Sequence, residues 1–307
     1  MGAVINFLRL LAERISKENK YKLYIAGLII TIIVVLLSGL SGWLIERLFL
    51  FYEAKIPVFS SLLFSFILSS SLASRSLTKS ILEIINLISK DKLGDSLSDV
   101  RRKLSHIVGR DVDSLDKNEI LRATAETASE NSVDGIFAPL FWIFVGTIFW
   151  KLNQFMPGPL AMAWVFKASS TIDSMIGYKN GNLKFLGFTG AKLDDLMTWI
   201  PSRIVLISLP FCSIPKQSIS RTIRDAWKDG IVDSSPNSGI SEAIFAYCAE
   251  VRMGGINYYK GKKNTKAIIG KSYPVATINS VKRILNLSFR LQLVWLFAFL
   301  VIIKFVN

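Results

Sequence analysis

Uncharged, strongly apolar runs alternate with polar segments along this chain of 307 residues. Leu23–Ile45 contains 23 residues without a charge, and Ile56–Ser74 contains 19. A third run, Ile284–Ile303, is interrupted only by Arg290. Because about 20 apolar residues suffice for a helix to cross the hydrocarbon core of a bilayer, these runs predict membrane-spanning helices. The pattern therefore indicates a polytopic integral membrane protein.

Three shorter apolar runs are harder to interpret. Gly135–Trp150 would be only about 24 Å long as a helix, and Leu152–Phe166 is interrupted by Pro157-Gly158-Pro159. These two runs could form a tight hairpin, or the second could be re-entrant, and hydropathy does not decide between them. Ile204–Pro215 has 12 residues, a length more typical of a buried core or interfacial helix than of a span. We therefore expect about four to five hydrophobic helices.

The polar segments also show helical periods. Residues 1–22 carry five basic side chains among apolar ones, which predicts a basic amphipathic helix lying along the membrane surface. In residues 75–134, apolar side chains recur on two helical stripes. The stripes are Ile81, Ile84, Ile85 and Ile88, and then Leu97, Val100, Leu104 and Ile107. Asp116, with Glu119 three residues later, resembles a capping box that begins a further helix.

We find no internal repeat and no convincing alternating pattern of strands. The expected fold class is all-α, a polytopic membrane protein with helical cytoplasmic segments at residues 75–134 and 167–283. The whole of residues 1–307 is expected to form one membrane-embedded domain.

Composition supports this interpretation and narrows the chemistry. Hydrophobic residues make up 51% of the chain, and the mean hydropathy is +0.41. The single histidine, His106, argues against a Ser-His-Asp triad or a multi-histidine metal site, and Cys212 and Cys248 indicate no disulfide framework. Any metal would be a hard cation with oxygen ligands, which favours Mg²⁺.

The formal net charge of +14 has two interpretations. Lys and Arg beside membrane spans normally mark the cytoplasmic side, and they could also attract a polyanionic substrate. Nucleic acid is a poor third choice, because no nucleic-acid-binding motif accompanies the charge.

An acidic segment just before an apolar run is the first candidate for a functional site. Glu126, Glu130 and Asp134 follow one another at steps of four, so a regular helix would place all three carboxylates on one face. Such like charges repel, and a cation or a phosphate–metal complex between them would relieve that repulsion. The alternative is a solvated helix face with no ligand.

Four further polar segments lie between the apolar runs. They are Asp173–Asn180, Lys192–Arg203, Ser235–Gly239 and Arg252–Tyr258. The first helix should end at Gly177, which leaves Lys179 and Asn180 on a turn suited to an anion. Each segment alone could also be an ordinary helix end or cap. Thr265–Ser272 resembles a phosphate-binding loop without its first glycine, and we discount it because no buried strand precedes it.

Together, and in this order, these segments resemble the cobinamide-phosphate synthase family of cobalamin biosynthesis (CobD/CbiB). The matching stretches are Glu130-Asn131-Ser-Val-Asp134-Gly135-Ile-Phe-Ala138-Pro139-Leu140-Phe141, Thr171-Ile-Asp173-Ser174-Met175-Ile-Gly177-Tyr178-Lys179-Asn180, Leu193-Asp194-Asp195, Trp199-Ile200-Pro201-Ser-Arg203, Ser235-Pro236-Asn237-Ser-Gly239 and Val251-Arg252-Met-Gly254-Gly255-Ile-Asn257-Tyr258-Tyr259. They cover roughly residues 72–290, and their number and order make the resemblance specific.

The chain departs from the family pattern at several positions. Gly181 stands where the family usually has Glu, Lys192 where it has Arg, and Asp233 where it has the His of a His-Pro-Ser-Pro-Asn segment. The family's opening Asp-Pro segment is absent before Met1, so we expect either a start further upstream or a dispensable first-helix contribution.

The resemblance implies an amide-forming ligase, adenosylcobinamide-phosphate synthase. Such an enzyme attaches aminopropanol, its phosphate or a close amino alcohol to adenosylcobyric acid, with ATP as cosubstrate and Mg²⁺ as cofactor. It would sit in the cell membrane as a multi-pass protein with its active site toward the cytoplasm. The lipid bilayer is a partner, nucleic acid is not, and a homo-oligomer is left open.

The resemblance also names candidate site residues. The candidates for catalysis are the carboxylates Glu126, Glu130, Asp134, Asp173, Asp194 and Asp195, with Glu130 and Asp134 as metal ligands. The candidates for substrate binding are Asn131, Lys179, Asn180, Arg203, Ser235, Asn237, Arg252 and Asn257. Of these, Lys179, Arg203 and Arg252 are expected to bind phosphate, because fixed cations stabilise oxyanions.

Two functions from other classes remain as alternatives. A transporter or channel would place charges inside its spans, whereas Leu23–Ile45 and Ile56–Ser74 have none. A non-catalytic membrane signalling or regulatory relative of the same family would be expected to lose the polar segments, which largely persist here.

The distribution of basic residues predicts the membrane topology. Residues 1–22 and 216–290 are rich in Lys and Arg and should face the cytoplasm, with the loop near Lys55 outside. A cysteine placed at position 52 should react with an impermeant thiol reagent added from outside, and one at position 262 should not. The reverse labelling pattern would refute this topology.

Overall fold

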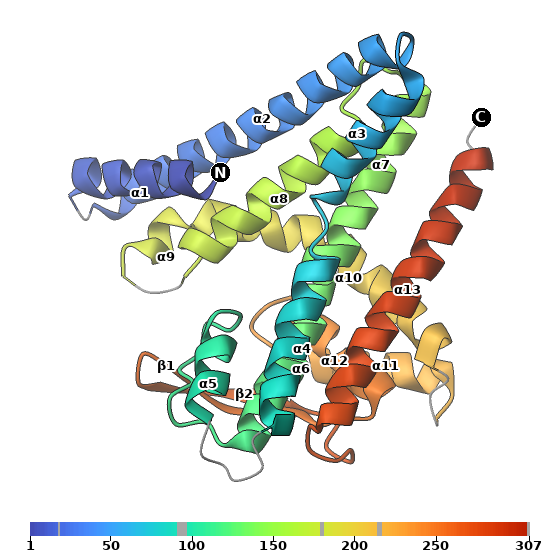
Figure 1. The fold of residues 1–307 in the computed structure, drawn as a ribbon. Helices are drawn as coiled ribbons and strands as arrows, with labels where there is room; N and C mark the ends of the chain where they lie inside the picture. Colours follow the sequence, from blue (N-terminus) through green and yellow to red (C-terminus); the bar gives the residue numbers. More distant parts are fainter. Residues whose placement is uncertain (18, 91–96, 179–180, 214–216, 306–307) are drawn as a thin grey trace. The chain divides into compact units, whose positions relative to one another are not determined.

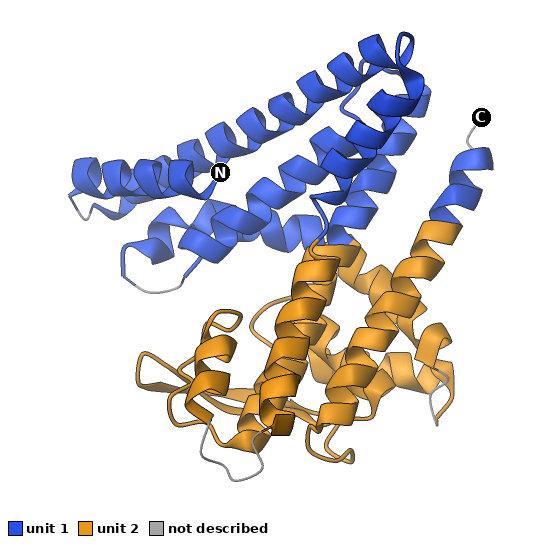
Figure 2. Ribbon diagram, viewed as in Figure 1, with its two compact units in different colours: residues 1–72, 138–198, 298–307 blue, residues 73–137, 199–297 orange. Residues whose placement is uncertain are grey.

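A computed structural model describes the chain except for residues 18, 91–96, 179–180, 214–216 and 306–307. The described residues are mostly helical, with one two-stranded antiparallel sheet (Figure 1). The all-α class is therefore confirmed, with a small hairpin added. The chain divides into two compact units, shown in Figure 2.

Unit 1 comprises residues 1–72, 138–198 and 298–307. Its helices are α1 (Gly2–Ser16), α2 (Lys20–Glu53), α3 (Pro57–Ser69), α7 (Ala138–Leu152), α8 (Pro159–Ile176) and α9 (Leu183–Leu186), with the first part of α10 (Phe188–Ser213) and the end of α13 (Ile278–Phe305). The predicted surface helix is α1, which buries Ile5 and Ala12.

Helix α2 packs closely along α8 in unit 1, and a glycine makes this possible. A Cβ on Gly42 would lie 2.7 Å from Ala161 Cα, closer than side-chain atoms approach a backbone. Small residues at helix contacts allow backbones to approach one another in this way, a common arrangement in membrane proteins.

A buried carboxylate near the end of α2 caps the beginning of α8. Glu46 accepts hydrogen bonds from the backbone N–H groups of Gly158, Leu160 and Ala161 at 2.9, 2.7 and 2.9 Å. The first N–H groups of a helix have no partner within it, and the residue before α8, Gly158, has no side chain to supply one. Glu46 therefore satisfies the start of α8 from a distant part of the chain.

Unit 2 comprises residues 73–137 and 199–297. Its elements are α4 (Ser74–Lys90), α5 (Leu97–Ser105), α6 (Lys117–Ser132), the π-helical turn η1 (Val133–Phe137), α11 (Ile219–Gly230), α12 (Ser238–Ala249), β1 (Met253–Tyr259) and β2 (Lys262–Ile269), with the second part of α10 and most of α13.

The two predicted amphipathic helices are α4 and α5. The four isoleucines of the first stripe are buried in α4, and Val100 and Leu104 are buried in α5. The predicted helix start at Asp116 is also present, because its side chain accepts a 2.8 Å hydrogen bond from the Glu119 N–H at the beginning of α6.

The sequence pattern did not reveal the β-hairpin. All but one of the residues in β2 before Ile269 are exposed, so the strand lacks the alternation of buried and exposed positions that marks a half-buried strand. The hairpin turns at Lys260 and Gly261, which have φ of 51° and 74°. The Asp111 carboxylate accepts hydrogen bonds from both of their N–H groups, at 3.0 and 2.7 Å.

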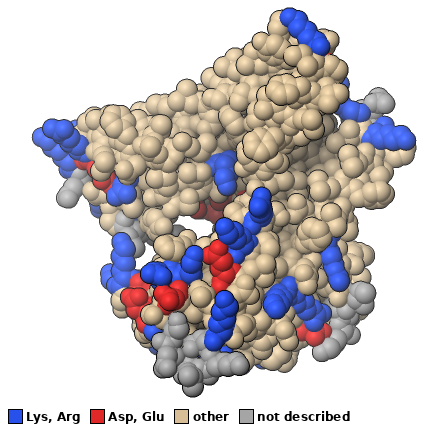
Figure 3. Space-filling model, viewed as in Figure 1, with Lys and Arg blue, Asp and Glu red and all other residues tan. Residues whose placement is uncertain are grey.

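Among the described residues, four helical segments are long and apolar enough to cross a membrane: Lys20–Glu53, Lys117–Leu152, Phe188–Ser213 and Ile278–Phe305. A fifth arises if the bent pair α3 and α4 is one span. These helices define a multi-pass membrane protein. On the face drawn in Figure 3, uncharged side chains cover the middle of α2 and α3, and charged ones gather over α4 and α5.

The structure differs from the sequence interpretation at α10. The run Ile204–Pro215 was expected to be a short core or interfacial helix. Its residues 204–213 belong to a helix of 26 residues that continues through Pro201 and Pro210, and its last two residues lie outside the described part of the chain. The charges at Lys192, Asp194 and Asp195 hid this helix, since they lie in its first two turns and shorten the uncharged run.

Candidate functional site

Helix α6 is the central element of unit 2. Residues 120–129 are all buried, and α6 packs against α4, α5, α12 and β1. Ala123, Ala125 and Ala128 are fully buried, so small side chains let these neighbours approach closely. The polar side chains of residues 120–129 are therefore held among packed elements instead of on a solvated face.

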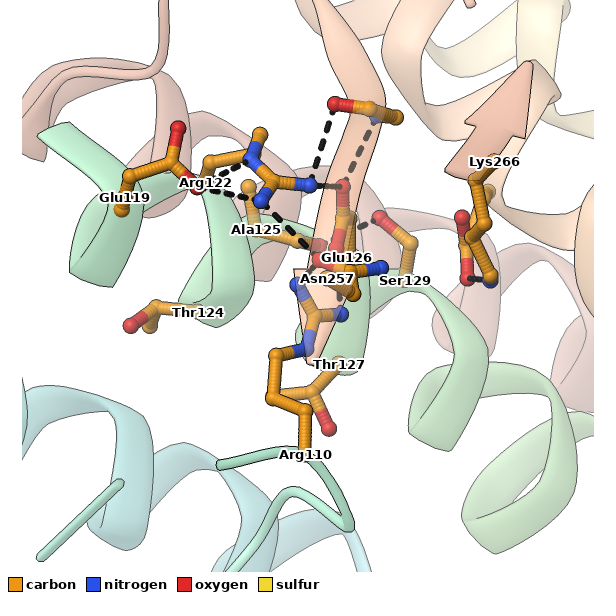
Figure 4. A network of polar contacts seen from close by, with 12 residues as sticks. Arg110, Glu119, Arg122, Thr124, Ala125, Glu126, Thr127, Ser129, Asn257 and Lys266 are labelled. Carbon is orange, nitrogen blue, oxygen red and sulfur yellow. Dashed lines mark hydrogen bonds and ion pairs between the residues drawn. The ribbon is translucent and has the colours of Figure 1, made fainter. Parts of the chain in front are cut away.

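The Glu126 carboxylate lies at the centre of a buried ion-pair network (Figure 4). One oxygen accepts from Arg110 Nη2 at 2.5 Å, and the other accepts from Arg122 Nη1 at 3.0 Å and from the Gly254 N–H at 2.8 Å. Glu126 is 1% exposed. Both of its oxygens are thus engaged by protein groups, so Glu126 holds α6, β1 and the Arg110 loop together.

Asn257, on β1, completes this network. Its side-chain oxygen accepts from Arg110 Nη1 at 2.7 Å and from Arg122 Nη2 at 3.0 Å. Arg122 also pairs with Glu119 and donates to the carbonyls of Gly254 and Ile256. The Asn257 side-chain nitrogen is buried without a hydrogen-bond partner in the part of the chain that the structure describes. Such an atom is costly unless a ligand or water satisfies it.

A second buried charge cluster joins α12 to β2. Lys266 Nζ lies 2.8 Å from Glu242 Oε1 and 3.3 Å from Asp233 Oδ2. Glu242 is 1% exposed. Asp233, the residue that stands where the family pattern has a histidine, therefore forms an ion pair with the β2 lysine.

The protonation of this cluster follows from its burial. Burial raises the pKa of the Glu242 carboxyl to about 8; Lys266 opposes this rise, and the charges of Glu126 and Glu130 add to it. Burial alone would lower the pKa of Lys266, yet the carboxylates of Glu242, Glu130 and Asp233 raise it. Lys266 is therefore a permanent cation here, and Glu242 can exchange a proton near neutral pH.

The acidic face expected from the sequence is interrupted. Glu130 lies near the end of α6, but Asp134 lies in the π-helical turn, where the extra residue per turn breaks the four-residue spacing. Both side chains are half-buried. Asn131 donates to Thr127 Oγ1 at 2.9 Å. Because π turns occur frequently at functional sites, the interruption lies where a ligand site is expected.

The Ser-Pro-Asn segment and Arg203 form a hydrogen-bonded polar cluster before α12. Arg203 donates to Asn237 Oδ1 at 2.5 Å and to the Pro236 carbonyl at 2.8 Å. Ser235 Oγ accepts from the N–H groups of Asn237 and Ser238 at 3.4 and 3.2 Å. These three candidates for substrate binding therefore contact one another.

The remaining acidic candidates and the turn after α8 lie apart from this cluster in the sequence. Asp173, Asp194 and Asp195 belong to unit 1, where Asp195 lies 3.7 Å from Lys192 Nζ. Helix α8 ends at Ile176, so the predicted end at Gly177 is confirmed. Lys179 and Asn180 lie outside the described residues.

Arg252 has an exposed side chain just before β1. The discounted phosphate-loop segment lies on β2 and the turn after it, and the next helix begins only at Ile278.

Sequence reasoning missed Arg110, Arg122, Glu242 and Lys266. Local signals existed for two of them. Arg122 stands four residues before Glu126, a favourable spacing for a helical ion pair. Glu242 is the only charged residue in α12. Arg110 and Lys266 lie far along the chain from their partners and gave no such signal.

The fold and the site define a class: a multi-pass helical membrane protein with a buried, charge-rich polar unit. Comparisons identify the family. The family model described as CobD/Cbib protein matches residues 1–288, and the chain belongs to this family.

Named relatives agree with this assignment. The chain is 37% identical over 283 residues to the cobalamin biosynthesis protein CobD of Synechocystis sp., covering 92% of this chain and 78% of the relative. It is 32% identical over 292 residues to CbiB of Salmonella typhi, covering 94% and 84%. It is 32% identical over 308 residues to CobD of Clostridium acetobutylicum, covering 100% and 91%. No solved structure matches the chain. The protein thus has a role in cobalamin biosynthesis, as its family does.

The Glu126 network predicts a large loss of stability when its carboxylate is neutralised. Glu126→Gln would leave the buried Arg110 without its carboxylate partner and Arg122 with Glu119 alone, so we expect the free energy of unfolding to fall by about 3–5 kcal/mol. Thermal or denaturant unfolding in detergent, followed by circular dichroism, measures this change. Asp99→Asn, which breaks the exposed pair with Arg102, is the control and should cost at most about 1 kcal/mol. Equal effects of the two variants would contradict the central role of Glu126.

The Glu242 pKa predicts a pH dependence of stability. The unfolded chain loses the Glu242 proton near pH 4.5, whereas the folded protein keeps it until pH is about 8. The folded state therefore binds more protons in this window, and the stability due to Glu242 falls as pH rises through it. Glu242→Gln should flatten the curve of unfolding free energy against pH between these values. A curve with unchanged slope in the variant would show that Glu242 does not hold its proton.

Proposed function

We propose that this protein is an amide-forming ligase that joins adenosylcobyric acid to aminopropanol or its phosphate, giving adenosylcobinamide or its phosphate. The observation that carries the proposal is the family match over residues 1–288, within which the motif residues recur in order. The polar chemistry of unit 2 supports it, because carboxylates and fixed cations gather around α6.

Amide formation from a carboxylate requires activation of the acid. ATP, as cosubstrate, would supply this by transferring its terminal phosphoryl group to the carboxylate, which gives an acyl phosphate and releases ADP. The amine would then attack the acyl carbon, form the amide and release inorganic phosphate and a proton. Cations that meet the phosphate oxygens stabilise the charge that develops in such steps. Basic side chains near the polar cluster, Arg252 among them, suit that role.

Magnesium would accompany the nucleotide. Mg²⁺ is usually held by one or two carboxylates together with substrate phosphates and water. Within the described ranges, no group of three or more His, Cys, Asp or Glu side chains is placed to hold an ion. The donor set thus fits a metal that arrives with phosphate, with Glu130 and Asp134 as its protein ligands.

The remaining acidic candidates divide by their environment. Glu126, with both oxygens engaged by arginines and a backbone N–H, suits a positioning role for Asn257 and the arginines. Glu130 and Asp134 are half-buried and suit contact with a ligand. Asp173, Asp194 and Asp195 stay candidates in unit 1. We place the active site on the cytoplasmic side of the cell membrane, on the basis of the basic residues in 216–290.

The proposal predicts that two carboxylates are essential for turnover. Membranes containing the protein would receive adenosylcobyric acid, aminopropanol phosphate, ATP and Mg²⁺, and the amide would be detected by mass spectrometry. Glu130→Gln and Asp134→Asn should each lower the rate by about 100-fold or more, because a lost charge removes stabilisation of the reacting groups. The variants should remain folded, since neither side chain belongs to the apolar core.

Asp113→Asn is the matched control, since Asp113 is exposed in the same unit and lies outside the motifs. Near-normal activity of both site variants would show that Glu130 and Asp134 have no catalytic role and belong to an ordinary solvated helix face. Absence of the amide with the unaltered protein would refute the ligase itself.

A further inference from the structure

A groove on unit 2 opens beside the first turn of α6. Its inner part, about 240 Å³, is lined by Asn118, Glu119, Arg122, Arg252, Gly254, Ile268, Val275 and Ala276. Its outer part, about 450 Å³, is lined by Lys117, Asn118, Leu121, Val275, Ala276, Thr277, Ile278 and Asn279. The two parts share Asn118, Val275 and Ala276, so they form one continuous groove between the beginnings of α6 and α13.

The groove carries two cations that no carboxylate among the described residues neutralises. Arg122 is paired with Glu119 and Glu126. The side chains of Arg252 and Lys117, in contrast, have no ion-pair partner among the residues that the structure describes. The backbone N–H of Arg252 donates to the Pro274 carbonyl at 2.8 Å, which holds this arginine at the groove wall.

The rest of the lining suits an organic group. Val275 and Ile268 are 44% and 42% exposed, so apolar side chains face the space. Asn118 and Asn279 add amide donors and acceptors. Ligand sites are typically apolar hollows with a few placed polar groups. Free cations beside apolar walls therefore fit an anion with an organic body better than a simple ion.

The groove also adjoins the ion-pair network. Arg122 lines the inner part and donates to Glu126 and Asn257. The unpartnered Asn257 side-chain nitrogen thus belongs to the network that forms one wall of the groove. All these residues lie in unit 2.

We propose that this groove binds a phosphate ester, with Arg252 and Lys117 contacting the phosphate and Val275 and Ile268 packing on the organic part. This rests on the proposed function, in which two phosphate esters take part: the nucleotide and the amino alcohol phosphate. The groove would bind one of these two esters, and the buried carboxylates would take no part in that binding.

The first test measures binding by isothermal titration calorimetry on the full chain in detergent, with ATP, aminopropanol phosphate and inorganic phosphate as separate probes. Arg252→Gln and Lys117→Gln should each weaken binding of one ester by about ten- to a hundredfold. Arg252→Lys should also weaken it, because lysine cannot make the two-pronged contact of a guanidinium. Lys228→Gln is the control, since Lys228 is an exposed cation on α11 outside the groove lining.

The second test fills the groove. Val275→Trp should abolish binding of the same ester, because the larger ring occupies the shared part of the lining. Val232→Trp is the control, since Val232 is 66% exposed and does not line the groove. Circular dichroism confirms that each variant is folded.

The binding results distinguish between the two possible phosphate esters, the nucleotide and the amino alcohol phosphate. Loss of ATP binding alone assigns the groove to a nucleotide, and loss of aminopropanol phosphate binding alone assigns it to the amino alcohol. Unchanged affinity for both esters in Arg252→Gln, Lys117→Gln and Val275→Trp overturns the inference, as does a response of inorganic phosphate only.

Amide formation tests the proposed ligase function, and it is measured separately from ester binding, which tests the groove. Ester binding that depends on the groove without amide product would leave this inference standing and refute the ligase. Amide product with unchanged ester affinity in the groove variants would support the ligase and refute the groove as the ester site.

Discussion

The buried carboxylate of Glu126 is the contact on which unit 2 depends. It joins a loop residue, a residue of its own helix and the backbone of a strand, at Arg110, Arg122 and Gly254. Charges buried in this way require well-placed partners, because desolvation otherwise exceeds their attraction. Here the partners include two guanidinium groups, which also donate to Asn257, Glu119 and carbonyl oxygens. The network therefore defines where β1 lies against α6, and hence where Arg252 and the groove wall lie.

The polar unit combines fully satisfied groups with a few that are not. Glu126 uses both oxygens, whereas Glu242 Oε2 and the Asn257 side-chain nitrogen are buried without hydrogen-bond partners in the described part of the chain. A protein interior tolerates few such atoms. Their presence in adjoining networks of unit 2, beside an interrupted helix, distinguishes this region from a purely structural salt-bridge cluster.

What the sequence could predict depended on whether the signal was local. The cap at Asp116 and the isoleucine stripe of α4 involve residues a few positions apart, and the structure has both. The hairpin escaped notice because most of β2 is exposed and polar, although Lys260-Gly261 is a turn signal. The Arg110–Asn257 and Lys266–Glu242 contacts join residues 147 and 24 positions apart, and no periodicity can indicate such pairs. The acids of α6 were found from their spacing, but the cations that hold them were not.

The cap that Glu46 provides for α8 has a consequence for how the chain folds while the ribosome synthesises it. Its partner N–H groups lie 112 to 115 residues later in the chain, and the segment between includes α4, α5 and α6 of the other unit. At about 5–20 residues per second, translation needs roughly 6–23 s to supply them. During this interval α2 has been made, but the carboxylate near its end has no partner from α8. Unit 1 therefore cannot be completed before the first part of unit 2 has left the ribosome, and the two units must mature in an interleaved order.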